Sequence, residues 1–424
     1  FSHVEVPLVR SFVLSSKAGS EAWVEPEILG STYQFKVRLG VQPKGSLVGT
    51  VERTGATCIM SQSAIPFAYI RTEGNAGRLS EKLMAIVVEG KRGRLYLPPT
   101  REAAEIAKAA QPGWNPEHTL PANPRNFNTP NYGLLTFGDL FTNRQLVALT
   151  TFSDLVKEAR KKAEQDAIAV GMDDDGKPLA EGGEGASAYA EALAVYLSFA
   201  INKMADRGST ICSWDSSRSS TRNTFGRQAI PMTWDFAEPN PMSDSTGNFV
   251  SGIQWAYDVL QGMNPVVRGF ALQQDATTQT LSENAVVSTD PPYYDNIGYA
   301  DLSDFFYVWM RKTLRSLYPD LFSTMAVPKE EELIATTYRH NSKDEAEAFF
   351  LTGMTRAVNN LTVQAHPAFP ITIYYAFKQS ETKEGDTTSA GWVTFLEAVI
   401  GAGLSIDGTW PMRTEMGNRM IGSG

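Results

Sequence analysis

The stretch Ser288-Thr289-Asp290-Pro291-Pro292-Tyr293-Tyr294-Asp295 decides how the rest of this sequence is interpreted. It follows Asn284-Ala285-Val286-Val287, a short apolar run ending in β-branched residues, which is typical of a buried strand. Such a strand delivers the polar tetrad 290–293 to its carboxyl end. Ligands bind at that edge of an open α/β sheet. The sequence therefore predicts a ligand site at the tetrad.

The tetrad is suited to holding the exocyclic amine of a nucleobase. This amine is a poor nucleophile because its lone pair is delocalised into the ring, and two acceptors on its two hydrogens localise that lone pair. Asp290 supplies one acceptor, and the carbonyl of Pro291 supplies the other, since Pro291 and Pro292 fix φ and stiffen the turn. Tyr293 offers a ring on which a base rotated out of the duplex stacks. The alternative is an ordinary strand-to-loop turn, because Pro and Asp favour turns for local reasons.

Composition limits the class of protein. The chain has 424 residues, 42% of them hydrophobic, which suffices for two or three domains with cores. It contains no run of eighteen apolar residues and no signal peptide, so we expect a cytoplasmic protein without a membrane partner. Two cysteines, Cys58 and Cys212, argue against a disulfide framework. With a net charge of −9, contact with nucleic acid requires local basic patches.

Residues 1–110 are expected to form a small β-rich module that ends in a helix over 100–110. Its segment 51–61 resembles half of a zinc-ribbon knuckle in which Ser61 replaces the second cysteine. Zinc takes four Cys or His ligands in such sites, and Cys58 with the distant His3 does not provide them. We therefore predict no metal and a small buried role for Cys58. The expected strands are 4–14, 33–41, 47–53 and 94–97.

Residues 111–225 are predicted to be a linker followed by a helical region. The Pro- and Asn-rich stretch 111–130 is typical of a domain boundary. An amphipathic pattern over 135–170 predicts a long helix capped by Thr142, and an apolar helix is expected over 189–205.

A polar cluster at 209–223, followed by Arg227, contains Arg218 and Arg222 among short hydroxyl side chains. These residue types suit contacts with a phosphate backbone, although a flexible Ser-rich loop has the same composition. We expect these three arginines, with Tyr294 beside the tetrad, to contact DNA.

Residues 226–424 are predicted to carry the catalytic part. Strands alternate with helices on both sides of the tetrad, which favours a doubly wound, mostly parallel α/β sheet. Ser303 is the expected cap of the helix that follows the tetrad. The expected helices are 249–260, 299–312, 344–364 and 392–402, and the expected strands are 284–287, 370–376 and 406–411.

Three runs carry a resemblance over most of the chain: Tyr132-Gly-Leu-Leu-Thr-Phe-Gly-Asp-Leu-Phe141, Trp234-Asp-Phe-Ala-Glu238 and Asp290-Pro-Pro-Tyr-Tyr-Asp-Asn-Ile-Gly-Tyr-Ala-Asp301-Leu-Ser-Asp-Phe-Phe. With them the chain resembles large bacterial and archaeal adenine-specific DNA methylases that have an N-terminal domain of unknown function and a zinc-ribbon-like insertion. The resemblance implies a Rossmann-like S-adenosylmethionine-dependent methyltransferase sheet with a small β-rich insertion module and a helical insertion. It also implies methyl transfer to the exocyclic amine of adenine in DNA.

The cofactor site is only partly present in the sequence. In methyltransferase sheets the strand before the catalytic one commonly ends in an Asp that binds the adenine amine of the cofactor, and Asp275, followed by Ala276, falls at that place. The glycine-rich cofactor loop of the family is not found, and the nearest candidate, 400–403, has the pattern of a helix C-cap. We therefore expect that loop upstream of Phe1, and expect the sequence to be cut at 422–424.

Other functions stay open at this point. Cytosine-amine methyltransferases more often have Ser in the first tetrad position, so Asp290 favours adenine, and RNA is an alternative substrate. A different class is a catalytically silent DNA-binding subunit of a phage-defence or restriction-modification system, with other subunits of that system as partners. The absent glycine loop favours the silent subunit, whereas the intact Asp290 and Tyr293 favour the enzyme.

Overall fold

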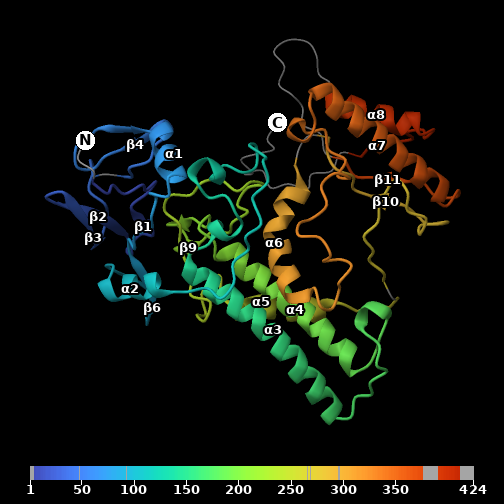
Figure 1. Ribbon diagram of the computed structural model, residues 1–424, viewed down its shortest axis with the longest axis horizontal. Helices are drawn as coiled ribbons and strands as arrows, with labels where there is room; N and C mark the ends of the chain where they lie inside the picture. The colour runs from blue at the N-terminus through green and yellow to red at the C-terminus, as the bar shows by residue number, and fades with distance from the viewer. Residues whose placement is uncertain are drawn as a thin grey trace. The chain divides into compact units, whose positions relative to one another are not determined.

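The chain is a mixed α/β protein that divides into two compact units. The first unit consists of Phe1–Asn264 with Leu302–Val327, and the second of Pro265–Asp301 with Pro328–Gly424. Figure 1 shows their elements along the chain. The predicted domain limits at 110 and 225 both lie within the first unit. The computed structural model describes residues 4–46, 48–91, 93–264, 266–267, 269–294, 297–375 and 390–410.

The first unit begins with a three-stranded antiparallel sheet of β1 (Val13–Ser15), β2 (Ala22–Leu29) and β3 (Thr32–Leu39). Leu29 pairs with Thr32, so β2 and β3 are joined by a two-residue turn. Gly30 in that turn has a φ of 62°, a left-handed conformation that glycine adopts without a steric penalty.

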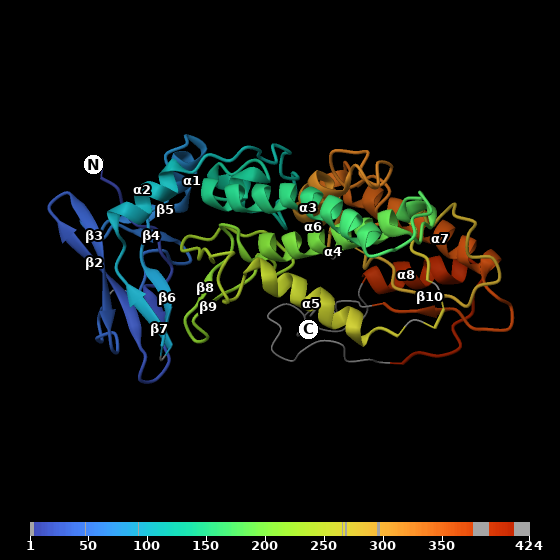
Figure 2. The ribbon, with the colours of Figure 1, turned by 90° about the horizontal axis from the view of Figure 1, so that it is seen from below.

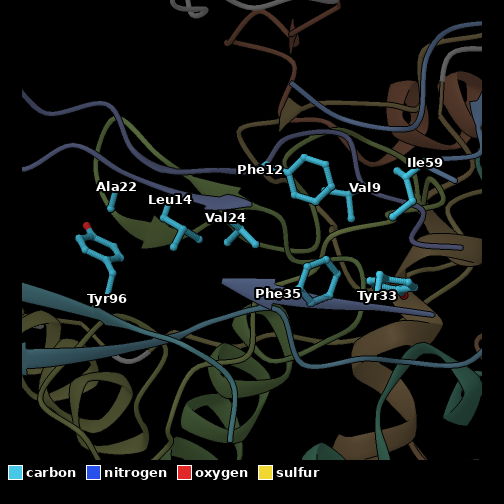
Figure 3. Packing of buried hydrophobic residues seen from close by; sticks show 9 residues of the cluster. All are labelled: Val9, Phe12, Leu14, Ala22, Val24, Tyr33, Phe35, Ile59 and Tyr96. Atoms are coloured by element: carbon cyan, nitrogen blue, oxygen red, sulfur yellow. The ribbon is translucent and has the colours of Figure 1, made fainter. Parts of the chain in front are cut away.

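The sheet buries one face in an apolar core. Because side chains alternate along a strand, Ala22 and Val24 on β2 lie on the same face, as do Tyr33 and Phe35 on β3. Phe12 is fully buried, and its ring centroid lies 6.3 Å from that of Phe35. Figure 3 shows the members of this cluster, which are Val9, Phe12, Leu14, Ala22, Val24, Tyr33, Phe35, Ile59 and Tyr96.

Short elements complete the β-rich module. Cys58 is buried, as predicted. The predicted strand over 47–53 does not form among the described residues, where Val51 makes only an isolated bridge with Ala56. Figure 2 shows the β6–β7 hairpin near the sheet, to whose core it contributes Tyr96. The elements are β4 (Gly55–Thr57), β5 (Ala64–Pro66), α1 (Phe67–Asn75), β6 (Ile86–Gly90), β7 (Gly93–Leu97) and α2 (Arg101–Ala109).

Three long helices follow in the first unit, α3 (Asn143–Ala169), α4 (Ala186–Arg207) and α5 (Phe249–Gly262). Thr142 caps α3 as predicted, in a capping box where its hydroxyl accepts from the Gln145 N–H. Gly252 allows α5 to approach α4 closely, because a Cβ at this position would lie 3.1 Å from the Cα of Ala200. The short elements around them are η1 (Thr129–Tyr132), η2 (Gly138–Leu140), η3 (Leu179–Glu181), β8 (Trp214–Asp215) and β9 (Ser220–Thr221).

Helix α6 (Tyr299–Leu314) begins in the second unit and contributes Leu302–Leu314 to the first. Ser303 lies inside this helix, so its prediction as the cap is wrong: helix formation starts one turn earlier, at Tyr299. The part of α6 that belongs to the first unit packs there through aromatic side chains. The Trp309 ring meets Phe141 edge-on with centroids 5.5 Å apart.

The second unit is organised around a parallel strand pair, β10 (Ser288–Thr289) and β11 (Thr372–Ile373). Its core lies between α7 (Lys343–Gln364) and α8 (Ala390–Gly401), where Phe350 and Phe395 are buried in one cluster. A 3-10 turn, η4 (Thr337–Arg339), precedes α7. The chain has no strand over 404–410, so the strand predicted from 406 is wrong there, and Pro411 lies outside the described residues.

The predicted doubly wound sheet is not formed by the described residues. Strands make up only 13% of the described residues against 37% in helices, and the sheets they form have two or three strands each. The β10–β11 pair is the parallel one among them. Within the same described ranges, no helix is long and apolar enough to cross a bilayer.

Replacing Phe12 by Ala should destabilise the β-rich module by about 3–5 kcal/mol, because a fully buried ring is lost from a closed core. Hydrogen exchange of the β2 and β3 amides, read by mass spectrometry, measures this change locally. Leu39→Ala on β3 is the matched control, since Leu39 is 76% exposed and its loss should leave exchange unchanged. Equal protection in all three proteins would contradict this description of the core.

Candidate functional site

Asp290 lies directly after β10, at the carboxyl end of the parallel pair. The pair is held by Thr372 N–H donating to the carbonyl of Val287 (3.0 Å) and Tyr374 N–H donating to the carbonyl of Thr289 (2.8 Å). The strand therefore begins at Ser288, four residues later than the apolar run 284–287 predicted and immediately after that run ends. The side chain of Asp290 is exposed. An exposed carboxylate at this edge is accessible to solvent, and its contact with a ligand stays a prediction.

Aromatic side chains pack against Tyr293 of the tetrad. Tyr293 is half-buried, and its ring meets that of Tyr375 edge-on, with centroids 5.4 Å apart at 71°. Tyr375 in turn stacks on Phe395 of α8, with centroids 4.0 Å apart at 11°. This column of three rings restricts the orientation of Tyr293. Pro291 and Pro292 are also half-buried.

Tyr294 anchors the loop after the tetrad. Its hydroxyl donates to Glu347 Oε1 at 2.5 Å, its ring packs edge-on against Phe350, and its carbonyl accepts from the N–H of Ala335 at 2.9 Å. Its φ of 40° is unusual for a residue other than glycine, so the surrounding contacts must hold it there. These bonds direct the side chain towards α7, and its contact with DNA stays a prediction.

A buried ionic cluster lies further along the same loop. The Asp301 side chain is 1% exposed and forms an ion pair with Arg339, whose Nη2 lies 3.1 Å from Asp301 Oδ1. Arg339 Nη1 also pairs with Glu332 Oε2 at 2.8 Å, and the Tyr338 hydroxyl donates to Asp301. Glu332 Oε1 accepts from the N–H of Ala300 at 3.0 Å, which satisfies a donor in the first turn of α6.

Burial and pairing shift the pKa values of this cluster. Burial by itself lowers the pKa of Arg339, but the carboxylates of Asp301 and Glu332 outweigh it, so the pKa is raised. Burial, and then the hydrogen bond to Asp301, raise the pKa of Tyr338. The guanidinium stays charged and the phenol stays neutral. Nothing in the sequence singles out Glu332, Tyr338 or Arg339, because the stretch 329–340 carries no signal of its distant partner Asp301.

The predicted cofactor residues lie in the second unit. Asp275 Oδ1 accepts from the N–H and the hydroxyl of Thr277, at 2.8 and 2.9 Å, and the first of these bonds is the main reason that the pKa of Asp275 is lowered. The carbonyl of Ala276 accepts from the side chain of Asn360 on α7 at 3.0 Å. The expected strand before Asp275 is not formed over 269–275, where Leu272 is exposed.

The predicted DNA-contacting arginines lie in the first unit, and all three side chains are exposed. Arg222 Nη2 lies 3.3 Å from Asp215 Oδ2, and the N–H of Arg218 donates to Asp215 Oδ1 at 3.2 Å. A hydrogen bond from the Ser217 hydroxyl is the main cause of the lowered pKa of Asp215. The acidic residue therefore organises the β8–β9 turn that presents Arg218 and Arg222; Arg227 follows that hairpin.

Comparison with family models, curated proteins and solved structures yields no match to this chain. No group of three His, Cys, Asp or Glu side chains suited to a metal ion occurs in the described part of the chain. The interpretation of the site therefore depends on its own geometry.

Replacing Arg339 by Met should destabilise the second unit by about 3–5 kcal/mol, because Asp301 and Glu332 are left buried without their cation. Urea denaturation, followed by hydrogen exchange of the α7 amides, measures the loss. Arg356→Met, which removes an exposed arginine from α7, should have little effect. Equal stability of the two variants would show that the cluster does not hold this unit together.

Replacing Tyr294 by Phe should raise the pKa of Glu347, because the hydroxyl of Tyr294 is the main cause of its lowered value. The stability that this bond contributes is present above the unfolded pKa of Glu347 and is lost as the pH falls through the lowered folded pKa. The difference in stability between wild type and variant should therefore shrink in acid.

Carboxyl-carbon NMR of Glu347 and denaturation at pH 7 and pH 3 test this. Tyr374→Phe, on an exposed ring of the same unit, is the control. An unchanged titration of Glu347 in the Tyr294 variant would rule out the proposed cause.

Proposed function

We propose that the protein is an S-adenosylmethionine-dependent DNA methyltransferase that acts on the exocyclic amine of adenine. The observation that carries the proposal is an exposed Asp290 at the carboxyl end of a parallel strand pair, followed by two prolines and a ring braced by Tyr375. This is the arrangement that the sequence chemistry requires of a site for a flipped base.

The residues of the tetrad have distinct roles in the proposed reaction. The Asp290 carboxylate accepts one N–H of the amine, and the Pro291 carbonyl accepts the other, which localises the nitrogen lone pair. Pro291 and Pro292 fix φ and stiffen the turn that follows Asp290. Tyr293 stacks on the base, and its restricted ring lowers the entropy cost of that contact. Charged and oriented acceptors are most effective when they are in place before the reaction.

The cofactor supplies an electrophilic methyl group when it is bound. Asp275 fits one part of its site, since its lowered pKa keeps the carboxylate ionised and Thr277 occupies only part of its acceptor capacity. Its role is to accept from the amine of the adenosine, next to Ala276. We further propose that β10 and β11 belong to a Rossmann-like sheet.

The exposed arginines Arg218, Arg222 and Arg227 are the proposed contacts to the DNA backbone. Their charge is local in a chain with a net charge of −9, and such patches are what an acidic protein requires to bind a polyanion.

Replacing Asp290 by Ala should lower the rate of methyl transfer by about 100-fold or more, because one of the two acceptors on the amine is lost. The fold should persist, since this side chain is exposed. The full-length protein is incubated with methyl-labelled S-adenosylmethionine and duplex DNA, and the DNA is digested to nucleosides. Label in N6-methyladenine is the expected product.

Glu283→Ala is the matched control, because it removes another exposed carboxylate from the same segment. Wild-type rates in the Asp290 variant would refute its catalytic role. Label in methylcytosine would assign the other base, and label in RNA alone would assign the other nucleic acid. DNA binding without any methyl transfer would favour a silent subunit.

A further inference from the structure

A basic cleft of about 470 Å³ lies in the first unit. Its lining residues are Lys157 on α3, Arg311 and Lys312 in the last turn of α6, and Arg315 and Ser316 just after that helix. Figures 1 and 2 show α3 and the carboxyl end of α6 side by side. Four cations from two segments that are distant in sequence thus converge on one cavity.

Fold stability does not account for this gathering of charge. Cations in the last turn of a helix interact favourably with its dipole, which explains Arg311 and Lys312. Lys157 lies in the middle of α3, where that effect is absent. In the described part of the chain, Lys312 pairs with Asp154 at 2.9 Å, and no carboxylate forms an ion pair with Lys157, Arg311 or Arg315. Like charges that line one cavity repel each other, so an anion would relieve the repulsion.

The cations at the end of α6 are held in fixed directions. Arg311 Nε donates to the carbonyl of Thr324 at 2.8 Å, which uses one of the five donors of the guanidinium fork. Lys312 is 13% exposed at its side chain, and its ammonium lies 5.1 Å from the centroid of the Trp114 ring as well as beside Asp154. The site is therefore organised before any ligand arrives.

We propose that this cleft binds the phosphodiester backbone of duplex DNA. Arginine, lysine and serine are the side chains that contact phosphate oxygens, and all three types line the cavity. The choice of DNA among polyanions rests on the proposed function, but the binding itself requires neither Asp290 nor the cofactor. The cleft adds a second basic contact in the first unit to that of the β8–β9 turn.

The test is fluorescence anisotropy of a labelled DNA duplex, titrated with the full-length protein in the absence of cofactor at several salt concentrations. The double variant Arg311→Gln, Arg315→Gln should bind about tenfold more weakly than wild type. The slope of log K against log salt should fall by about 1.8, since each lost phosphate contact accounts for about 0.9. Lys162→Gln, Lys177→Gln is the control, because it removes the same charge from exposed positions outside the cleft.

A weaker affinity and a smaller salt slope in the cleft variant alone would support the proposal. Wild-type affinity in that variant would overturn it, and so would equal losses in both double variants, because net charge would then explain the effect. The single variant Arg315→Gln, which leaves the bond from Arg311 to Thr324 in place, repeats the test if the double variant misfolds. A phosphopeptide that loses binding in the cleft variant while duplex affinity is unchanged would also overturn it.

The binding test of the cleft and the methyl-transfer test of the tetrad can fail independently. Loss of duplex binding in the cleft variant, with no methyl transfer by wild type, would support the cleft and refute the methyltransferase. Unchanged duplex binding in the cleft variant, together with methyl transfer that depends on Asp290, would refute the cleft and support the methyltransferase.

Discussion

The conformation of the second unit depends on the ion pairs that the buried guanidinium of Arg339 forms with Asp301 and Glu332. Removing charges from water costs several kcal/mol per ion, and this cost is recovered only when each charge has well-placed partners. Asp301, Glu332 and the Tyr338 hydroxyl provide them, and Glu332 also binds the N–H of Ala300. The cluster thereby fixes where α6 begins, which in turn sets the far end of the loop that carries the tetrad.

The tetrad loop is constrained at three places by different forces. Parallel strand pairing holds its start, where the carbonyl of Thr289 accepts from Tyr374. Its middle is held by Tyr294, through the short bond to Glu347 and the packing on Phe350, which together sustain a positive φ. Ion pairing holds its end. The loop thus presents Asp290, just before its two prolines, to solvent from a rigid base, and the proposed catalysis by oriented acceptors requires such rigidity.

Local signals in the sequence predicted local structure, and long-range contacts were not predictable. The spacing of Thr142 and Gln145, three residues apart, is typical of a capping box. The sequence did not predict β2, which contains Pro26, a residue unfavourable in the middle of a sheet. Pro26 pairs with Phe35 of β3, and β1 pairs with β2 only at Ala22 and Trp23. No strand therefore needs the N–H that Pro26 lacks. Tyr338 meets Asp301 across 37 residues, and no periodicity encodes that meeting. The exposed Asp290 was found because its tetrad is contiguous.

Two groups of charges in this protein differ in how they are compensated, and that difference indicates what each does. Around Arg339, the charges are buried and paired with opposite charges from the chain. Around the basic cleft, four cations meet one paired carboxylate at a surface open to solvent. A buried cluster of paired charges stabilises a conformation, whereas a group of cations with too few carboxylate partners lowers its energy by binding an opposite charge. The same physical rule therefore explains the positioning role of the first group and is the basis of the anionic partner proposed for the second.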